Sequence, residues 1–134
     1  MKNVQYINPD GLNKNPAFSN VVIVPAGIKT IFIGGQDSIN ESGEIIGKGD
    51  IKKQTEQVLN NIKIALKSAG AGIENIIKWN IYIVQGNDPG PAFEISHKII
   101  GKIENPPAIT VVFVSSLVNP DFLVEIDAIA VVNE

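Results

Sequence analysis

A chain of 134 residues that is 44% hydrophobic and 19% charged has the composition of a single globular domain, which we expect to span residues 1–134. The net charge is -3, and all eleven cationic residues are lysines, so arginine is absent, as is cysteine. The composition excludes any mechanism that needs a guanidinium, a thiolate or a zinc–thiolate centre from this chain. With His97 as the lone histidine, we also expect no metal site and no cofactor.

The charge pattern indicates whether nucleic acid is a partner, and the N-terminal residues indicate whether the chain is exported. The weakly acidic balance argues against nucleic acid, because no basic cluster is longer than Lys52-Lys53. The N-terminal residues lack the apolar core of a signal peptide, and no apolar run approaches the roughly 18 residues that a membrane-spanning helix needs. We therefore predict a cytoplasmic protein without a membrane partner.

The first half of the chain predicts strands followed by a helix. Three short β-rich runs, at 4–7, 21–24 and 30–33, are separated by turn residues and predict a three-stranded meander. The polar stretch 37–50 predicts an exposed loop, with Asp37 in a solvated turn. From Asp50, a good N-cap residue, an apolar stripe with helical spacing predicts a helix over 51–69.

The second half alternates strand and helix. Period-two alternation predicts a half-buried strand over 76–84, with Ile77, Trp79, Ile81 and Ile83 on the core face. A shorter helix is predicted over 92–103, where the following Asn-Pro-Pro ends it. Two apolar strands, 109–114 and 122–132, complete the order βββαβαββ.

This order predicts an α+β fold with a six-stranded mixed sheet and two helices on one face. The other face then lacks a cover from its own chain, although the two late strands are apolar at nearly every position. Strands of that kind are usually buried on both sides. We therefore expect a homo-oligomer in which the bare sheet faces pack together.

Two features could carry chemistry. Gly34-Gly35-Gln36 ends a predicted strand, where backbone without side chains can approach a ligand closely, although a β-bulge explains the glycines equally well. Glu125 lies two residues before Asp127 on one side of an apolar strand. A carboxylate in such surroundings is costly unless it is paired or used, so a function, an ion pair and a hydrogen bond to backbone are all open interpretations of Glu125.

The glycine pair, the run Asn105-Pro106-Pro107-Ala108 and the C-terminal block 123–131 together resemble the Rid family, also called YjgF or L-PSP endoribonuclease-like. The resemblance covers essentially the whole chain. It implies a chorismate-mutase-like α+β fold and a homotrimer with ligand clefts at the subunit boundaries. It also implies a cofactor-independent activity, since the best understood members hydrolyse reactive 2-imino acids to 2-oxo acids and ammonia.

The resemblance also implies roles for particular residues. In active members an arginine after the Pro-Ala turn grips the substrate carboxylate, backbone groups hold the ligand, and a glutamate positions the attacking water. Carried onto this chain, the backbone groups belong to Gly34 and Gly35, with Gln36 beside them, and to Val111, while the glutamate is Glu125.

The chain departs from the family pattern at two ligand-binding positions. Ile109 stands at the position of the arginine, and Phe18 stands where active members have a tyrosine hydroxyl. The family's asparagine on the second helix falls near Phe93 or Glu94. Because isoleucine cannot pair with a carboxylate, we expect 2-iminobutanoate/2-iminopropanoate deaminase activity to be weak or absent.

We interpret the chain as a trimer whose clefts bind a small, neutral or weakly polar metabolite. Glu125 as a general base would make the cleft a deaminase-type hydrolase for an imine or enamine. Two alternatives stay open: a ligand-binding or regulatory trimer without catalysis, and an endoribonuclease or translation inhibitor of the L-PSP type.

Overall fold

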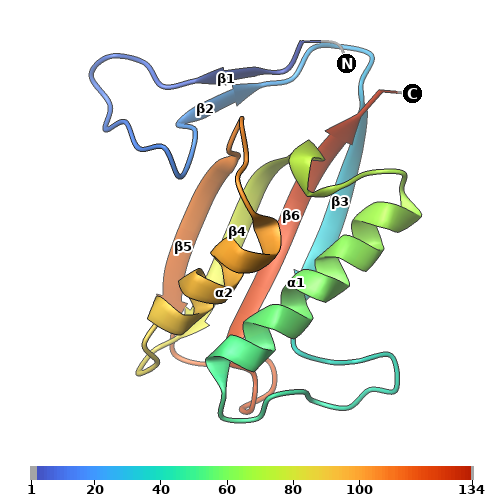
Figure 1. The fold of residues 1–134 in the computed structure, drawn as a ribbon, viewed down its shortest axis with the longest axis vertical. Coiled ribbons are helices and arrows are strands. Elements are labelled where there is room, and N and C mark those ends of the chain that lie inside the picture. Colours follow the sequence, from blue (N-terminus) through green and yellow to red (C-terminus); the bar gives the residue numbers. More distant parts are fainter. Residues whose placement is uncertain (1–2, 134) are drawn as a thin grey trace.

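The structure is a computed structural model that describes residues 3–133, and Figure 1 shows its fold. The order of strands and helices agrees with the predicted order βββαβαββ. The elements are β1 (Gln5–Ile7), β2 (Val21–Ile23), β3 (Lys29–Gln36), α1 (Ile51–Ser68), the short 3-10 helix η1 (Ile73–Asn75), β4 (Ile76–Val84), α2 (Gly90–Ile100), β5 (Ala108–Val114) and β6 (Val124–Val132).

The strands form two sheets, so the prediction of one six-stranded sheet is wrong. A four-stranded sheet has the order β3-β6-β4-β5, and β1 pairs with β2 in a separate antiparallel sheet. β3 pairs with β6 instead of β2, so the predicted meander ends after β2. The nine-residue β6 offers β3 a much longer hydrogen-bonded ladder than the three-residue β2 does.

The four-stranded sheet is mixed and carries both helices on one face, as predicted. β4 and β5 run parallel, whereas β6 is antiparallel to both of its neighbours. In Figure 1 both helices lie in front of this sheet. The apolar stripe of α1, made of Val58, Leu59, Ile62 and Leu66, is buried against the core-facing side chains of the sheet. This layer is the hydrophobic core.

Local signals set the ends of both helices. The Asp50 side chain accepts a hydrogen bond from the Lys53 backbone N–H (3.1 Å), which confirms the predicted N-cap of α1. α2 begins and ends earlier than predicted, at Gly90 and Ile100. Pro91 occupies its first turn, and Gly101 follows its last residue with a φ of 72°, a left-handed conformation that ends the helix.

A bulge at the start of β4 overturns one part of the predicted core. The register between β4 and β6 shifts between Ile76 and Lys78. An extra residue in a strand reverses the face on which the preceding side chains lie. Ile76 is therefore buried with Trp79, whereas Ile77, which we predicted on the core face, is only half-buried.

A buried glutamine ties α1 to the strand that carries Glu125. Gln54 is fully buried; its Nε2 donates to the Asp121 carbonyl (2.8 Å) and its Oε1 accepts from the Leu123 N–H (2.9 Å). Both partners lie directly before β6. These hydrogen bonds hold the segment before β6 in one position relative to α1. Leaving a buried donor or acceptor unpaired costs about 1–3 kcal/mol of stability.

The sheet face opposite the helices is apolar in part and exposed in this single chain. Phe32 of β3 is 77% exposed, and Val112 of β5 is 39% exposed. On the edge strand β5 the predicted burial of both sides is not met within residues 3–133, because the consecutive side chains of Val111, Val112 and Phe113 are all at least 39% exposed. The homo-oligomer that would cover these residues stays a prediction.

Candidate functional site

Glu125 lies on the open face of the sheet. Its neighbours Val124 and Ile126 are buried beneath the helices, so strand alternation turns Glu125 and Asp127 to the opposite side. Both carboxylates are half-buried there. The predicted placement of two carboxylates on one side of this strand is therefore confirmed.

Gly35 lies directly beneath the Glu125 carboxylate. A methyl group on the Gly35 Cα would be 2.5 Å from Glu125 Oε2 and 2.9 Å from its Cδ, so only glycine leaves room for the carboxylate in this position. The same methyl on Gly34 would meet nothing within 4 Å. The register between β3 and β6 shifts between Ile33 and Gln36, which confirms a β-bulge at the glycine pair. The bulge and the close approach thus occur together.

The sequence predicts a solvated turn at Asp37, and the structure places this residue differently. Its side chain is half-buried and interacts with the Glu125 side chain, and its Oδ1 is buried without a hydrogen-bond partner among the described residues. Burial, this hydrogen bond and the charge of Glu125 raise the pKa of Asp37 to about 7. Asn61 of α1 fixes the backbone there, since its Nδ2 donates to the carbonyls of Asp37 (3.1 Å) and Ile39 (2.9 Å).

Asp127 is held by two neutral donors from the neighbouring strand. Asn80 Nδ2 donates to Oδ1 (2.8 Å), and the Tyr82 hydroxyl donates to Oδ2 (3.2 Å). The Asp127 charge is the main cause that raises the pKa of Tyr82, so this phenol stays protonated and keeps donating. Asp127 thus has two donors within the sheet. Among the described residues, the side-chain interaction found for Glu125 is the one with Asp37.

The open face carries carboxylates without a compensating cation. Within residues 3–133 no lysine nitrogen lies within 4.0 Å of Asp37, Glu125 or Asp127. Lys78, which also lies on this face, donates to the Thr110 hydroxyl instead (2.7 Å). The ion-pair interpretation of Glu125 is therefore not met in a single chain.

The remaining predicted residues gather around β5. Phe18 is half-buried, and the adjacent Ser19 is pinned to the Pro-Pro turn: its N–H donates to the Pro107 carbonyl (3.0 Å) and its hydroxyl to the Pro106 carbonyl (2.6 Å). Ile109 follows this turn at the start of β5 and packs against the core, while Val111 is exposed. As an edge strand, β5 leaves a row of backbone groups unpaired on its outer side.

The predicted site residues thus form two groups that one chain keeps apart. Gly35 and Glu125 lie on β3 and β6, whereas Ile109 and Val111 lie on β5, and the order β3-β6-β4-β5 puts three strand spacings between β3 and β5. β6, which carries Glu125, is two spacings from β5, so at about 4.8 Å per spacing the separations from β5 are roughly 10 Å for β6 and 14 Å for β3. Within one chain, β4 lies between the two groups.

Three further candidate residues take no part in either group. The Gln36 side chain turns back to the Gly34 carbonyl (3.2 Å). Phe93 and Glu94 are exposed on α2, and Glu94 forms an ion pair with Lys52 of α1 (3.5 Å). Within one chain, neither helix residue occupies the position expected of a ligand-binding asparagine.

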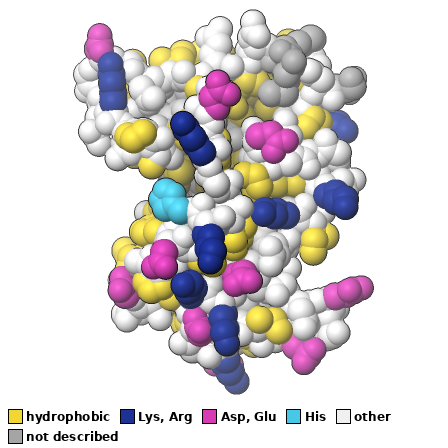
Figure 2. Space-filling view, viewed as in Figure 1, with side chains coloured by type: hydrophobic (Ala, Val, Ile, Leu, Met, Phe, Trp, Pro, Cys, Tyr) yellow, Lys and Arg dark blue, Asp and Glu magenta, His cyan; other side chains and the backbone are white. Residues whose placement is uncertain are grey.

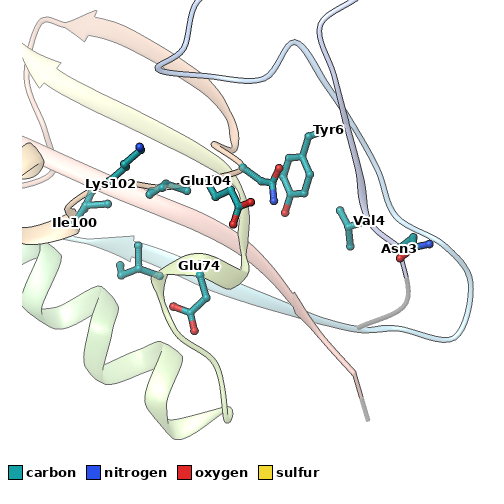
Figure 3. A pocket seen from close by; sticks show the side chains of 10 residues that line it. Asn3, Val4, Tyr6, Glu74, Ile100, Lys102 and Glu104 are labelled. Atoms are coloured by element: carbon teal, nitrogen blue, oxygen red, sulfur yellow. The ribbon is translucent and has the colours of Figure 1, made fainter.

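The two described cavities lie away from Glu125 and away from β5. One of about 470 Å³ opens between the N-terminal strand, η1 and the segment after α2, where Tyr6, Glu74 and Glu104 border the same space and the Lys102 ammonium points away from it (Figure 3). Burial raises the pKa of Tyr6. A second cavity, of about 360 Å³, lies along α1 beside Lys53 and Glu56. None of the predicted site residues lines either cavity.

The described residues offer no evident metal site or membrane-spanning helix, and their surface charges are mixed. Among residues 3–133, no group of three or more histidine, cysteine, aspartate or glutamate side chains is placed to hold a metal ion. None of the helices in that range is long and apolar enough to cross a membrane. Figure 2 shows acidic and basic side chains intermixed over the helix-bearing face, without a continuous basic track.

Sequence comparison places the chain among known proteins. Residues 12–132 match the family described as endoribonuclease L-PSP. A RutC family protein of Pyrococcus abyssi is 43% identical over 101 residues, which are 75% of this chain and 76% of the relative. A 2-iminobutanoate/2-iminopropanoate deaminase of Rattus norvegicus is 30% identical over 79 residues, which are 59% of this chain and 56% of the relative.

Solved structures share the fold. A protein of the conserved Rid family from Yersinia pestis superposes with a TM-score of 0.82 at 31% identity and covers 97% of this chain and 99% of its own. The YjgF gene product of Escherichia coli gives 0.68 at 29% identity, over 81% and 84% of the two chains. The two helices on one face of a mixed sheet therefore define the YjgF/L-PSP fold class. The chain belongs to the endoribonuclease L-PSP family, which includes the Rid and RutC proteins.

Proposed function

We propose that the chain forms a homotrimer and that clefts between its subunits hydrolyse a small imine or enamine that lacks a carboxylate group. The observation that carries the proposal is the Glu125 carboxylate, seated over Gly35 on an open sheet face and free of any cation within the described chain. A half-buried carboxylate without a cationic partner can take a proton from water, which is the task of a general base.

In this mechanism water is the nucleophile. Glu125 removes a proton from water as the water oxygen adds to the carbon of the C=N bond, and Glu125 passes that proton to the nitrogen. Glu125 then moves the hydroxyl proton of the resulting carbinolamine to the nitrogen, so that the C–N bond breaks, the C=O bond forms and a neutral amine leaves. Backbone N–H groups near Gly35, or at Val111 on the edge strand β5, are the donors that we assign to stabilise the developing charge.

The two separated groups support a cleft between subunits. Gly35 and Glu125 belong to one side of the sheet order and Val111 to the other, so a second copy would bring β5 to a first copy's Glu125. The exposed apolar side chains of the open face, including Phe32 and Val112, would be covered in the same assembly. A trimer resembling those implied by the family satisfies both requirements.

The absence of arginine supports a substrate without a carboxylate. No copy of this chain can supply a guanidinium, and we assign the arginine position of the family to Ile109. A substrate carboxylate would enter beside Asp37, Glu125 and Asp127 without a planar cationic partner. A charge-assisted hydrogen bond contributes about 1.5–3 kcal/mol, so its loss selects strongly against such substrates.

A matched pair of substrates tests this function. We expect the full chain to hydrolyse the carboxamide analogue of 2-iminobutanoate at least roughly tenfold faster than 2-iminobutanoate itself, as measured by product formation above the buffer blank, since about 1.4 kcal/mol corresponds to a factor of ten. Faster hydrolysis of 2-iminobutanoate would refute the carboxylate-free assignment.

Two other outcomes would replace the proposed function. If neither imine is hydrolysed above the blank, while native mass spectrometry shows a stoichiometric small molecule that leaves unchanged, the chain is a ligand-binding trimer. If a nuclease-free preparation degrades RNA in proportion to its own peak on a sizing column, it is an endoribonuclease. The intermixed charges of Figure 2 and the net charge of -3 argue against the latter.

A further inference from the structure

Asp37 and Glu125 come together from distant parts of the sequence, 88 positions apart. Gln36 pairs with Ile126 at the end of the β3–β6 ladder, so Asp37 leaves the strand beside Glu125. Two carboxyl groups at hydrogen-bond distance need a proton between them, because two carboxylates only accept. The buried Asp37 Oδ1 has no hydrogen-bond partner in the described structure, and a proton shared with the adjacent Glu125 carboxyl group would supply one.

The surroundings favour one proton on the pair. The groups on the elements packed against Asp37 are Glu125 of β6 and the neutral Asn61 of α1, and the next titratable groups on the open face are Asp127 and Tyr82. The cation on this face, Lys78, donates to the Thr110 hydroxyl and forms no ion pair with either carboxyl group. Without a positive charge beside two ionised carboxyls, the singly protonated pair is the stable form below about pH 7.

We propose that Asp37 is a positioning residue for Glu125, in which one shared proton lets the neutral Asp37 donate to Glu125 and hold that carboxylate over Gly35. The role in hydrolysis rests on the proposed function above, whereas the shared proton does not. One oxygen of Glu125 accepts from Asp37, and the other is left to take the proton of water. When Asp37 ionises, the two carboxylates repel and Glu125 loses its fixed position.

The expected pH dependence has a definite sign. Asp37 has an ordinary pKa of 3.8 and a folded-state pKa of about 7, so the folded protein binds this proton more tightly than the unfolded chain does. Its contribution to stability is fully present below pH 3.8 and is lost as the pH rises through 7. The hydrolytic rate should likewise fall above about pH 7 as the shared proton leaves.

The variant Asp37→Asn tests the proposal, because an amide keeps the donor and abolishes the titration. In carbon-13 NMR of the unmodified chain we expect the Asp37 carboxyl group to titrate near pH 7. In Asp37→Asn that step should vanish, and unfolding midpoints between pH 4 and 8 should decline less with pH. Glu41→Gln, an exposed carboxylate removed from the same loop, is the matched control and should leave both unchanged.

The results separate the two claims. Titration of Asp37 near pH 4 would overturn the shared proton. If the hydrolytic rate of Asp37→Asn falls above about pH 7 as much as that of the unmodified chain does, the positioning role is overturned. If the NMR step near pH 7 is present but no imine is hydrolysed, the shared proton is supported and the proposed hydrolysis is refuted.

Discussion

Replacing Glu125 with glutamine should lower kcat/KM for the carboxamide imine by about 10²–10⁴-fold, the usual contribution of a general base. Glutamine has nearly the same shape and can still occupy the space over Gly35, but its amide cannot take a proton from water. The side chain is on the open face, so the free energy of unfolding should change by no more than about 0.5 kcal/mol. Steady-state kinetics and thermal unfolding measure the two effects.

Asp127→Asn is the matched control for this prediction. It removes a carboxylate from the same face of the same strand, two residues away, where Asn80 and Tyr82 already hold that side chain. We expect its kcat/KM to stay within about tenfold of the unmodified chain. Equal losses in both variants, or full activity in Glu125→Gln, would remove Glu125 from the mechanism.

Gly35→Ala should reduce the same rate by about 10²-fold while leaving the fold intact. The added methyl would lie 2.5 Å from Glu125 Oε2, so the carboxylate must swing away from its position. A displacement of about 1 Å in a reacting group costs a rate factor of this size. The clash is with the end of a flexible side chain, and Gly35 has no left-handed φ, so the stability cost should stay below about 1 kcal/mol.

Gly34→Ala provides the comparison, because it makes the same change one residue earlier in β3 and meets nothing within 4 Å. Its rate and unfolding midpoint should match those of the unmodified chain. If Gly34→Ala lost as much activity as Gly35→Ala, the effect would belong to the strand as a whole. Full activity in Gly35→Ala would show that hydrolysis does not depend on the position of the Glu125 carboxylate against Gly35.

Local signals predicted much of the fold. The helical spacing and the Asp50 cap located α1, and the alternation around Glu125 and Asp127 put both carboxylates on one face. These features depend on neighbouring residues. The bulge that buries Ile76 in place of Ile77 depends on how β4 pairs with β6, and no residue of the run itself indicates that shift.

Long-range pairing explains the other differences. β3 joins β6, almost 100 residues away, and not the nearby β2, so the predicted six-stranded sheet became a four-stranded sheet and a separate pair. The same pairing brings Asp37 to Glu125. In the sequence Asp37 is one acidic residue in a polar loop, and only the register of β3 with β6 shows that it borders a second carboxyl group.

The central claim is that Gly35 and Glu125 of one subunit meet β5 of another, and the mass of the full chain in solution tests it most directly. Light scattering at micromolar concentration should give a particle of three times the 14.4 kDa subunit mass. A monomer would contradict the account, because one chain keeps β5 roughly 10 Å from the strand of Glu125 and 14 Å from the strand of Gly35.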